Sequence, residues 1–212
     1  MKLLFSIPLL FAASLAQAAS LDAEVKHLAQ AWDEVNFTFK GKEKEKALSV
    51  LAEEANALSS DWPNRAEPLI WEGIVLSSWA GAKGGLGALS LVDKARERLL
   101  EAERIDPKAL KGSLYTSLGS LYYQVPGWPL GFGDDDKARR YLEQALELNP
   151  DGIDPNYFYG DFLREEGEYR DAVEVLERAL RAPLRPGREM ADEGRRTEIR
   201  DTLRKVRENL GR

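Results

Sequence analysis

A repeating face of small and large apolar residues runs through the chain. Three segments, at 95–102, 138–145 and 172–179, each place alanine, leucine and alanine at intervals of four and three residues. Because this spacing puts the three side chains on one face of a helix, each segment is predicted to be a helix that packs closely on a neighbour.

The segment before each of these helices predicts a partner helix. In the segment 115–122, two tyrosines, a leucine and Gly119 share one face with a helical period, and the glycine would let two helix backbones approach closely. Gly160 precedes the third alanine-leucine-alanine segment in the same way. Upstream the pattern is weaker, and we align Val75 with these two glycines.

The spacing of the pairs points to a known repeat family. The interval from Ala138 to Ala172 is 34 residues, the period of the tetratricopeptide repeat, and residues 157–180 resemble that repeat almost throughout. The resemblance implies an all-α α-α superhelix, a tetratricopeptide-like solenoid of about four helix pairs with a C-terminal capping helix. The clearest repeats are 112–150 and 154–184.

Boundary signals agree with this pairing. Asp-Pro pairs at 106–107 and 154–155 place a hydrogen-bond acceptor before a proline, which is typical of a helix start, and Asn64 with Glu67 resembles a capping box. The predicted helices are 22–38, 43–59, 65–80, 86–105, 107–123, 134–149, 155–166, 168–182 and the capping helix 189–210. With this alignment, the turns inside the second and third pairs are eight and seven residues longer than that of the fourth.

The first residues predict an export signal. Lys2, an apolar stretch over 3–15 and an Ala-Gln-Ala end over 16–18 are typical of a secretory signal peptide, here 1–19, followed by one helical repeat domain at 20–212. We therefore expect a periplasmic or secreted protein that does not insert into the membrane after cleavage. The chain has no cysteine, so it has neither a disulfide nor a lipobox cysteine.

Composition argues against an enzyme and against nucleic-acid binding. The net charge is −6, and His27 is the only histidine, so we expect no catalytic residues, cofactor or metal, and no nucleic-acid partner. Asp134–Asp136 favours capping of the next helix over a cation site. The tail 181–212 carries ten basic and six acidic residues, which suits either a solvated helix with ion pairs or a basic strip that docks a partner.

The predicted binding surface is the concave wall. In tetratricopeptide proteins the first helix of each pair forms this wall, and the register implies Glu72, Leu76, Trp79, Thr116, Ser120, Tyr123, Asp154, Tyr157, Asp161 and Arg164 here. The aromatic members either line the groove or belong to the core. In the longer turn at 125–133, Trp128 and Phe132 either seal the core or line a pocket. The candidate partner-binding residues are Trp79, Thr116, Tyr123, Tyr157, Asp161, Arg164, Trp128 and Phe132.

A narrower resemblance covers about residues 66–207. The segments 112–138, 182–188 and 192–199 are similar to bacterial exported tetratricopeptide proteins related to TatT, which is associated with TRAP transporters. The resemblance implies a periplasmic solenoid that works with a solute-binding partner and can form an oligomer. The expected function is a non-enzymatic periplasmic binding or scaffold module for a protein or peptide partner. The alternative is a small-solute-binding component that works with a transporter.

Overall fold

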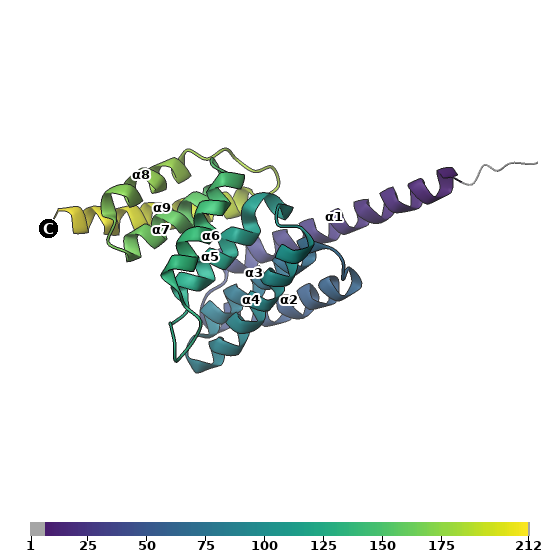
Figure 1. Ribbon diagram of the computed structural model, residues 1–212, viewed down its shortest axis with the longest axis horizontal. Helices are drawn as coiled ribbons and strands as arrows, with labels where there is room; N and C mark the ends of the chain where they lie inside the picture. The colour runs from purple at the N-terminus through teal and green to yellow at the C-terminus, as the bar shows by residue number, and fades with distance from the viewer. Residues whose placement is uncertain (1–6, 212) are drawn as a thin grey trace, which may run out of the picture.

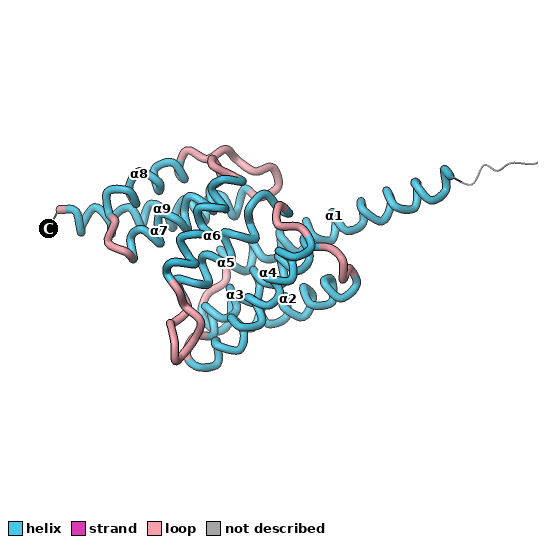
Figure 2. The backbone as a smooth tube through the Cα atoms, viewed as in Figure 1, coloured by secondary structure: helices cyan, strands magenta, loops and turns pink. Residues whose placement is uncertain are grey.

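The computed structural model describes the backbone of residues 7–211 and the side chains of residues 20–211. In this part of the chain, helices account for all the regular structure, and the longer connections are the loops 125–134 and 181–188 (Figures 1 and 2). The helices are α1 (Ile7–Thr38), α2 (Gly41–Asp61), α3 (Ala66–Lys83), η1 (Leu86–Ala88), α4 (Leu89–Ile105), η2 (Ala109–Gly112), α5 (Ser113–Gln124), α6 (Asp135–Leu148), α7 (Ile153–Glu165), α8 (Tyr169–Leu180) and α9 (Glu189–Leu210).

The repeated apolar face forms the core of three helix pairs. All nine alanine and leucine positions of the three predicted segments are 0% exposed, because each segment packs against the helix before it. A glycine on that first helix faces the central leucine of the second, so closely that a Cβ atom on the glycine would overlap the leucine Cγ. The three contacts are Gly73 on Leu99 (2.6 Å), Gly119 on Leu142 (2.5 Å) and Gly160 on Leu176 (2.6 Å).

These contacts correct the alignment of the second pair. Gly73, and not Val75, is the counterpart of Gly119, so every position transferred from Val75 moves by two residues. Ile74 and Ser77 therefore take the concave positions that the sequence assigned to Leu76 and Trp79. The error has a physical cause: α3 is buried on most of its surface, and a helix that is apolar all round has no single face from which its register can be fixed.

The helix predicted over 107–123 begins later than expected. Residues 107–112 form a turn and η2 instead, and α5 starts at Ser113. Asp106 accepts a hydrogen bond from the Lys108 backbone N–H at 2.9 Å, and Leu110 and Lys111 have positive φ values of 51° and 48°. The aspartate thus caps a turn between two repeats and not the helix.

Two other predicted caps are also wrong. The N-cap of α7 is Gly152, so Asp154 lies inside the first helical turn and its carboxylate is available for other partners. The N-cap of α3 is Arg65, without a side-chain cap, and Glu67 forms an ion pair with Arg65 at 2.7 Å.

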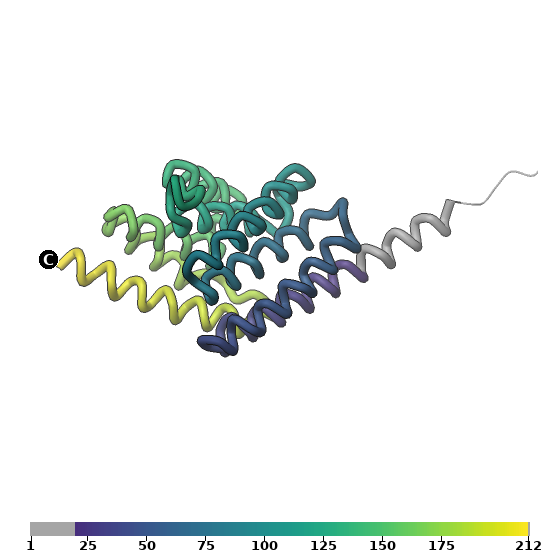
Figure 3. Tube along the Cα trace, turned by 90° about the horizontal axis from the view of Figure 1, so that it is seen from below, coloured from purple at the N-terminus to yellow at the C-terminus, as the bar shows by residue number. Residues whose placement is uncertain are grey.

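The two terminal helices meet on the concave side. The predicted capping helix is present as α9, which packs on α8 and α7, and its first turns contact α1 (Figure 3). Ile199 and Val206 on α9 are fully buried. The loop 181–188 brings the chain from the end of α8 back to α1, so the concave side is partly covered by the chain itself.

The N-terminal prediction falls partly outside the described residues. Residues 1–6 of the predicted signal peptide are not described, and residues 7–19 form the start of α1. None of the described helices combines the length and the apolar character that crossing a membrane requires.

Candidate binding groove

A polar cleft of about 120 Å³ lies on the concave side, where α3, α5 and α7 face α1, the loop 181–188 and α9. Hydroxyl side chains of α3 and α5 form one wall, and three arginines form the opposite wall. We call the hydroxyl wall the serine row, and it consists of Ser77, Ser78, Ser113, Thr116, Ser117 and Ser120. The arginines are Arg185, Arg188 and Arg195.

The serine row presents hydrogen-bond acceptors to the cleft. Each of its hydroxyls donates to a backbone carbonyl three or four residues earlier, at 2.7 to 3.1 Å. A hydroxyl that has used its one hydrogen retains lone pairs that can accept. Ser78 shows this, because its oxygen accepts from the Trp32 indole N–H at 2.8 Å.

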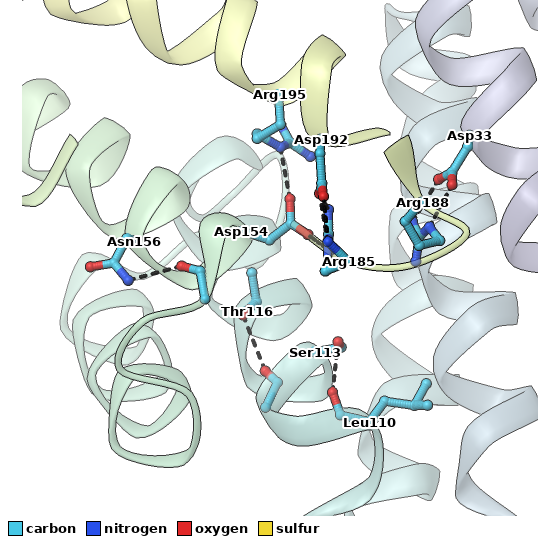
Figure 4. Close-up of polar contacts among 12 residues, drawn as sticks. Asp33, Leu110, Ser113, Thr116, Asp154, Asn156, Arg185, Arg188, Asp192 and Arg195 are labelled. Atoms are coloured by element: carbon cyan, nitrogen blue, oxygen red, sulfur yellow. Dashed lines mark hydrogen bonds and ion pairs between the residues drawn. The ribbon is translucent and has the colours of Figure 1, made fainter. Parts of the chain in front are cut away.

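Asp154 organises the arginine wall (Figure 4). Its two carboxylate oxygens accept from Arg195 at 2.8 Å and from Arg185 at 2.6 Å. Arg185 also binds Asp192, whose carboxylate accepts from the Arg185 side chain at 2.7 Å and from its backbone N–H at 2.8 Å. Burial alone would raise the pKa of Asp154, but the charges of Arg195 and Arg185 lower it to about 2.

A second ion pair ties the two ends of the chain together. Arg188, at the end of the loop 181–188, donates through two nitrogens to both carboxylate oxygens of Asp33 on α1, one at 2.6 Å. Asp33 is 3% exposed, and this burial raises its pKa even though Arg188 acts in the opposite direction. The Arg188 guanidinium lies 5.2 Å from the ring centre of Trp71 on α3. We call the Asp33–Arg188 pair the terminal latch.

Three of the sequence-predicted residues form one cluster on α5 and α7. The Tyr123 hydroxyl donates to Asp161 at 2.9 Å, and Arg164 donates to the other oxygen of Asp161 at 2.8 and 2.9 Å. Burial, followed by the charge of Asp161, raises the pKa of Tyr123 well above its usual range. The polar groups of these three side chains are therefore hydrogen-bonded to one another.

Of the other two predicted residues on these helices, Thr116 is buried and Tyr157 is partly exposed. Thr116 lines the polar cleft but is 4% exposed, and its hydroxyl donates to the Gly112 carbonyl at 3.1 Å. The Arg195 guanidinium of α9 lies 4.5 Å from the Tyr157 ring centre, and burial raises the pKa of Tyr157 to about 12. Tyr157 is therefore partly covered by α9 and keeps only part of its surface exposed.

The remaining three predicted residues lie apart from the polar cleft. Trp79 does not line it, as the corrected register requires. Phe132 packs edge-to-face on Tyr122 at 5.4 Å and lies under Arg96 at 3.9 Å, so it helps to seal the core. Trp128, in the same loop, is 91% exposed. The loop thus divides its apolar side chains between the core and the surface.

A larger apolar pocket of about 470 Å³ lies between the two long turns. Its lining includes Leu86, from the turn between α3 and α4, and Leu130, from the loop 125–134. Ser77 and Ser120 line both this pocket and the polar cleft. We call it the insertion pocket. The sequence predicted both insertions but not that they come together.

The comparisons with known proteins agree with the observed architecture. Residues 130–184 match the family model of the tetratricopeptide repeat. A crystal structure of a thermophilic TPR protein from Thermus thermophilus is similar, with a TM-score of 0.55, 20% sequence identity, and coverage of 92% of this chain and 97% of that chain. The fold is a tetratricopeptide-repeat solenoid. No curated protein matches the chain.

Sequence reasoning missed the inward arginines of this TPR solenoid. The basic surplus of the tail suits a solvated face or a docking strip, yet Arg185, Arg188 and Arg195 line the polar cleft on the concave side. The later arginines of α9 do form exposed ion pairs, such as Arg204 with Glu208 at 3.5 Å. The available signal was the loss of helical spacing before residue 189, which places 185 and 188 on a loop that can fold back.

Among the candidate metal ligands, Asp134 has a structural role. The Asp134 carboxylate accepts from the Lys137 backbone N–H at 3.0 Å and caps α6, so the capping interpretation is confirmed. This hydrogen bond lowers the pKa of Asp134. His27 is exposed on α1. Among the described residues, the acidic and histidine side chains form no group of three that could hold a metal ion.

Proposed function

We propose that this TPR solenoid is a non-enzymatic scaffold that binds a protein partner on its concave side. The fold supports a protein partner in general. The observation that carries the proposal is the continuous surface from the serine row into the insertion pocket, which offers hydrogen-bond acceptors and apolar area side by side. Such a mixture suits a polypeptide, since its backbone and side chains need both.

We further propose that the protein is exported and acts in the periplasm. The N-terminal residue pattern supports export: Lys2 precedes an apolar stretch over 3–15 and an Ala-Gln-Ala end over 16–18. The resemblance to TatT makes a transporter solute-binding protein the first partner to test. With one histidine and no cysteine, the chain offers neither a pair of histidines nor a thiol nucleophile.

Site-specific photo-crosslinking tests this proposal. A benzoylphenylalanine replaces Gln124, an exposed residue at the insertion pocket, in the full-length precursor expressed in its natural host. We expect one discrete protein adduct in the periplasmic fraction, displaced by excess unlabelled protein. The control places the crosslinker at Glu97, an exposed position of α4 outside the described pockets. Equal adducts from both positions, or none from Gln124, contradict the scaffold proposal.

The volume of the insertion pocket favours a second candidate, the solute-binding component. About 470 Å³ lies within the range of pockets that hold small ligands, about 300–1,000 Å³. Native mass spectrometry of protein purified from its host tests this candidate. A bound small molecule that is lost when Val92, on the pocket wall, is replaced by tryptophan would favour it over the scaffold.

A further inference from the structure

We propose that the insertion pocket is a docking site for an uncharged apolar segment of a protein partner, whose backbone continues along the serine row. The proposal rests on the scaffold function and adds the chemistry of the segment that is bound. Nothing in the 34-residue repeat requires this pocket, because it exists only where two insertions meet.

The pocket is formed by backbone that the protein itself holds in place. In the loop 125–134, the Asp134 N–H donates to the Tyr122 carbonyl at 2.9 Å and the Gly133 N–H donates to the Pro126 carbonyl at 3.0 Å. Phe132 anchors the same loop on Tyr122. A preformed site costs less ordering entropy on binding, so this geometry is suited to recognition.

The lining determines the charge of the occupant. None of the residues that line the pocket is charged, and its walls include the buried side chains of Ala80, Val92, Leu121 and Val125. A charged group that entered would lose its hydration without gaining a counter-charge, which opposes its binding. The occupant is therefore apolar at this point.

The rim indicates that the occupant is larger than the pocket. Leu86 is 81% exposed, Leu130 is 64% exposed, and Trp128, two residues before Leu130, is 91% exposed. A small molecule held inside the pocket would leave most of this apolar surface in water. A protein segment can fill the pocket and also cover the rim, as clustered exposed apolar side chains require.

Continuity with the polar cleft indicates where the segment runs. Ser77 and Ser120 border both spaces, and their hydroxyl hydrogens are donated to the carbonyls of Gly73 and Ser117. Their oxygens can accept from backbone N–H groups of a bound segment. The arginines beyond them are already paired with Asp33, Asp154 and Asp192, so the cleft offers little to attract an acidic segment.

Defined peptides test the proposal. The probe is a fluorescein-labelled, end-capped nonapeptide with Leu-Phe-Leu at the centre of a Gly-Ser frame, and its binding to the mature protein is measured by fluorescence anisotropy. Peptides with Ser-Ser-Ser or Asp-Phe-Asp at the centre are the comparisons. We expect the Leu-Phe-Leu peptide to bind about tenfold or more tightly than either, because only its centre can fill the apolar pocket.

Substitutions at the rim test whether the Leu-Phe-Leu peptide binds at the insertion pocket. L86S together with L130S should weaken this binding about tenfold or more, whereas L184S, which changes a leucine that is 69% exposed elsewhere, should leave it unchanged. Because all three side chains are exposed, circular dichroism should show the same helicity in each protein. Unchanged binding by L86S/L130S, or absence of binding up to millimolar peptide, overturns the proposal.

Two further results separate the possible failures. If dansyl-undecanoic acid binds the pocket and the Leu-Phe-Leu peptide does not displace it, the site is for a small apolar molecule and the proposal is wrong. If the adduct formed through Gln124 persists in L86S/L130S, the scaffold function stands and the docking site is wrong. Loss of that adduct in L86S/L130S but not in L184S supports both.

Discussion

At the scale of single residues, the glycine–leucine contacts determine how closely each helix pair packs. Gly119 lies against the fully buried Leu142, and a methyl group there would also approach the Ala138 carbonyl oxygen to 3.2 Å. Protein interiors are packed too densely to absorb such an overlap without movement. The closeness of α5 and α6 therefore depends on the absence of one side chain.

We expect G119A to destabilise the protein by about 1–2 kcal/mol, because the overpacking cost exceeds the gain in helix propensity. Urea unfolding followed by circular dichroism measures this change. Gly81 lies in α3, and a Cβ atom at this position would have no other atom within 4 Å apart from its chain neighbours and the local helix backbone. G81A is therefore the control and should be neutral or up to about 1 kcal/mol more stable. A neutral G119A would show that the pair can separate without cost.

Asp154 shows how charge stabilises the junction of α7 and α9. Its folded pKa of about 2 lies below the ordinary value of 3.8, so its contribution to stability is present above pH 3.8 and is lost as the pH falls towards 2. The stability difference between the wild type and D154N should therefore shrink by about 2 kcal/mol between about pH 5 and pH 2. Urea titrations at several pH values measure it.

Asp33 should behave in the opposite sense. Burial raises its pKa, so its contribution is fully present at low pH and is lost as the pH rises through the folded pKa. The free energy of unfolding of the wild type minus that of D33N should therefore be larger at low pH than at neutral pH. The same direction of change for D33N and D154N would contradict this account of the two carboxylates.

At the scale of elements, the terminal latch joins α1 to the loop 181–188. R188A would leave the buried Asp33 carboxylate without its partner, and we expect a loss of about 2–4 kcal/mol in unfolding free energy. R204A removes two pairs, with Asp201 and Glu208, whose side chains are all 57–62% exposed, and should cost less than about 1 kcal/mol. Urea unfolding at about pH 7 compares the two, and equal losses would show that the latch is not a special contact.

The elements also show what a single sequence can reveal. The alanine-leucine-alanine spacing predicted where these helices lie, because each of them buries one face, and the spacing of its own apolar residues shows which face that is. The register of α3 did not follow, since its apolar residues surround the helix. The role of Asp154 could not follow either: its arginine partners lie 31 and 41 residues away, and no local pattern records such a pairing. Of the residues that line the polar cleft, the sequence therefore indicated Thr116, Ser120 and Asp154 but none of the three arginines.

At the scale of the whole molecule, α9 covers the apolar face of the last helix pair, which could otherwise associate with other copies of the chain. Its residues Ile199, Leu203 and Val206 are at most 4% exposed against the last helix pair. Burial of each such side chain contributes about 1.5–3 kcal/mol, which together approaches the whole stability of an ordinary domain, about 5–15 kcal/mol. An uncapped repeat array exposes an apolar face that other copies can cover.

Truncation after Leu180 should therefore yield a chain that unfolds at a markedly lower temperature or self-associates. Circular dichroism melting and light scattering coupled to size-exclusion chromatography distinguish these outcomes from the full mature chain. Truncation after Arg207 is the matched control, because residues 208–211 are exposed and Arg207 retains its 2.8 Å ion pair with Glu177. If the shorter chain stayed monomeric with an unchanged melting temperature, α7 and α8 would not need α9, and its role would be confined to covering Asp154 and Tyr157 on the concave side.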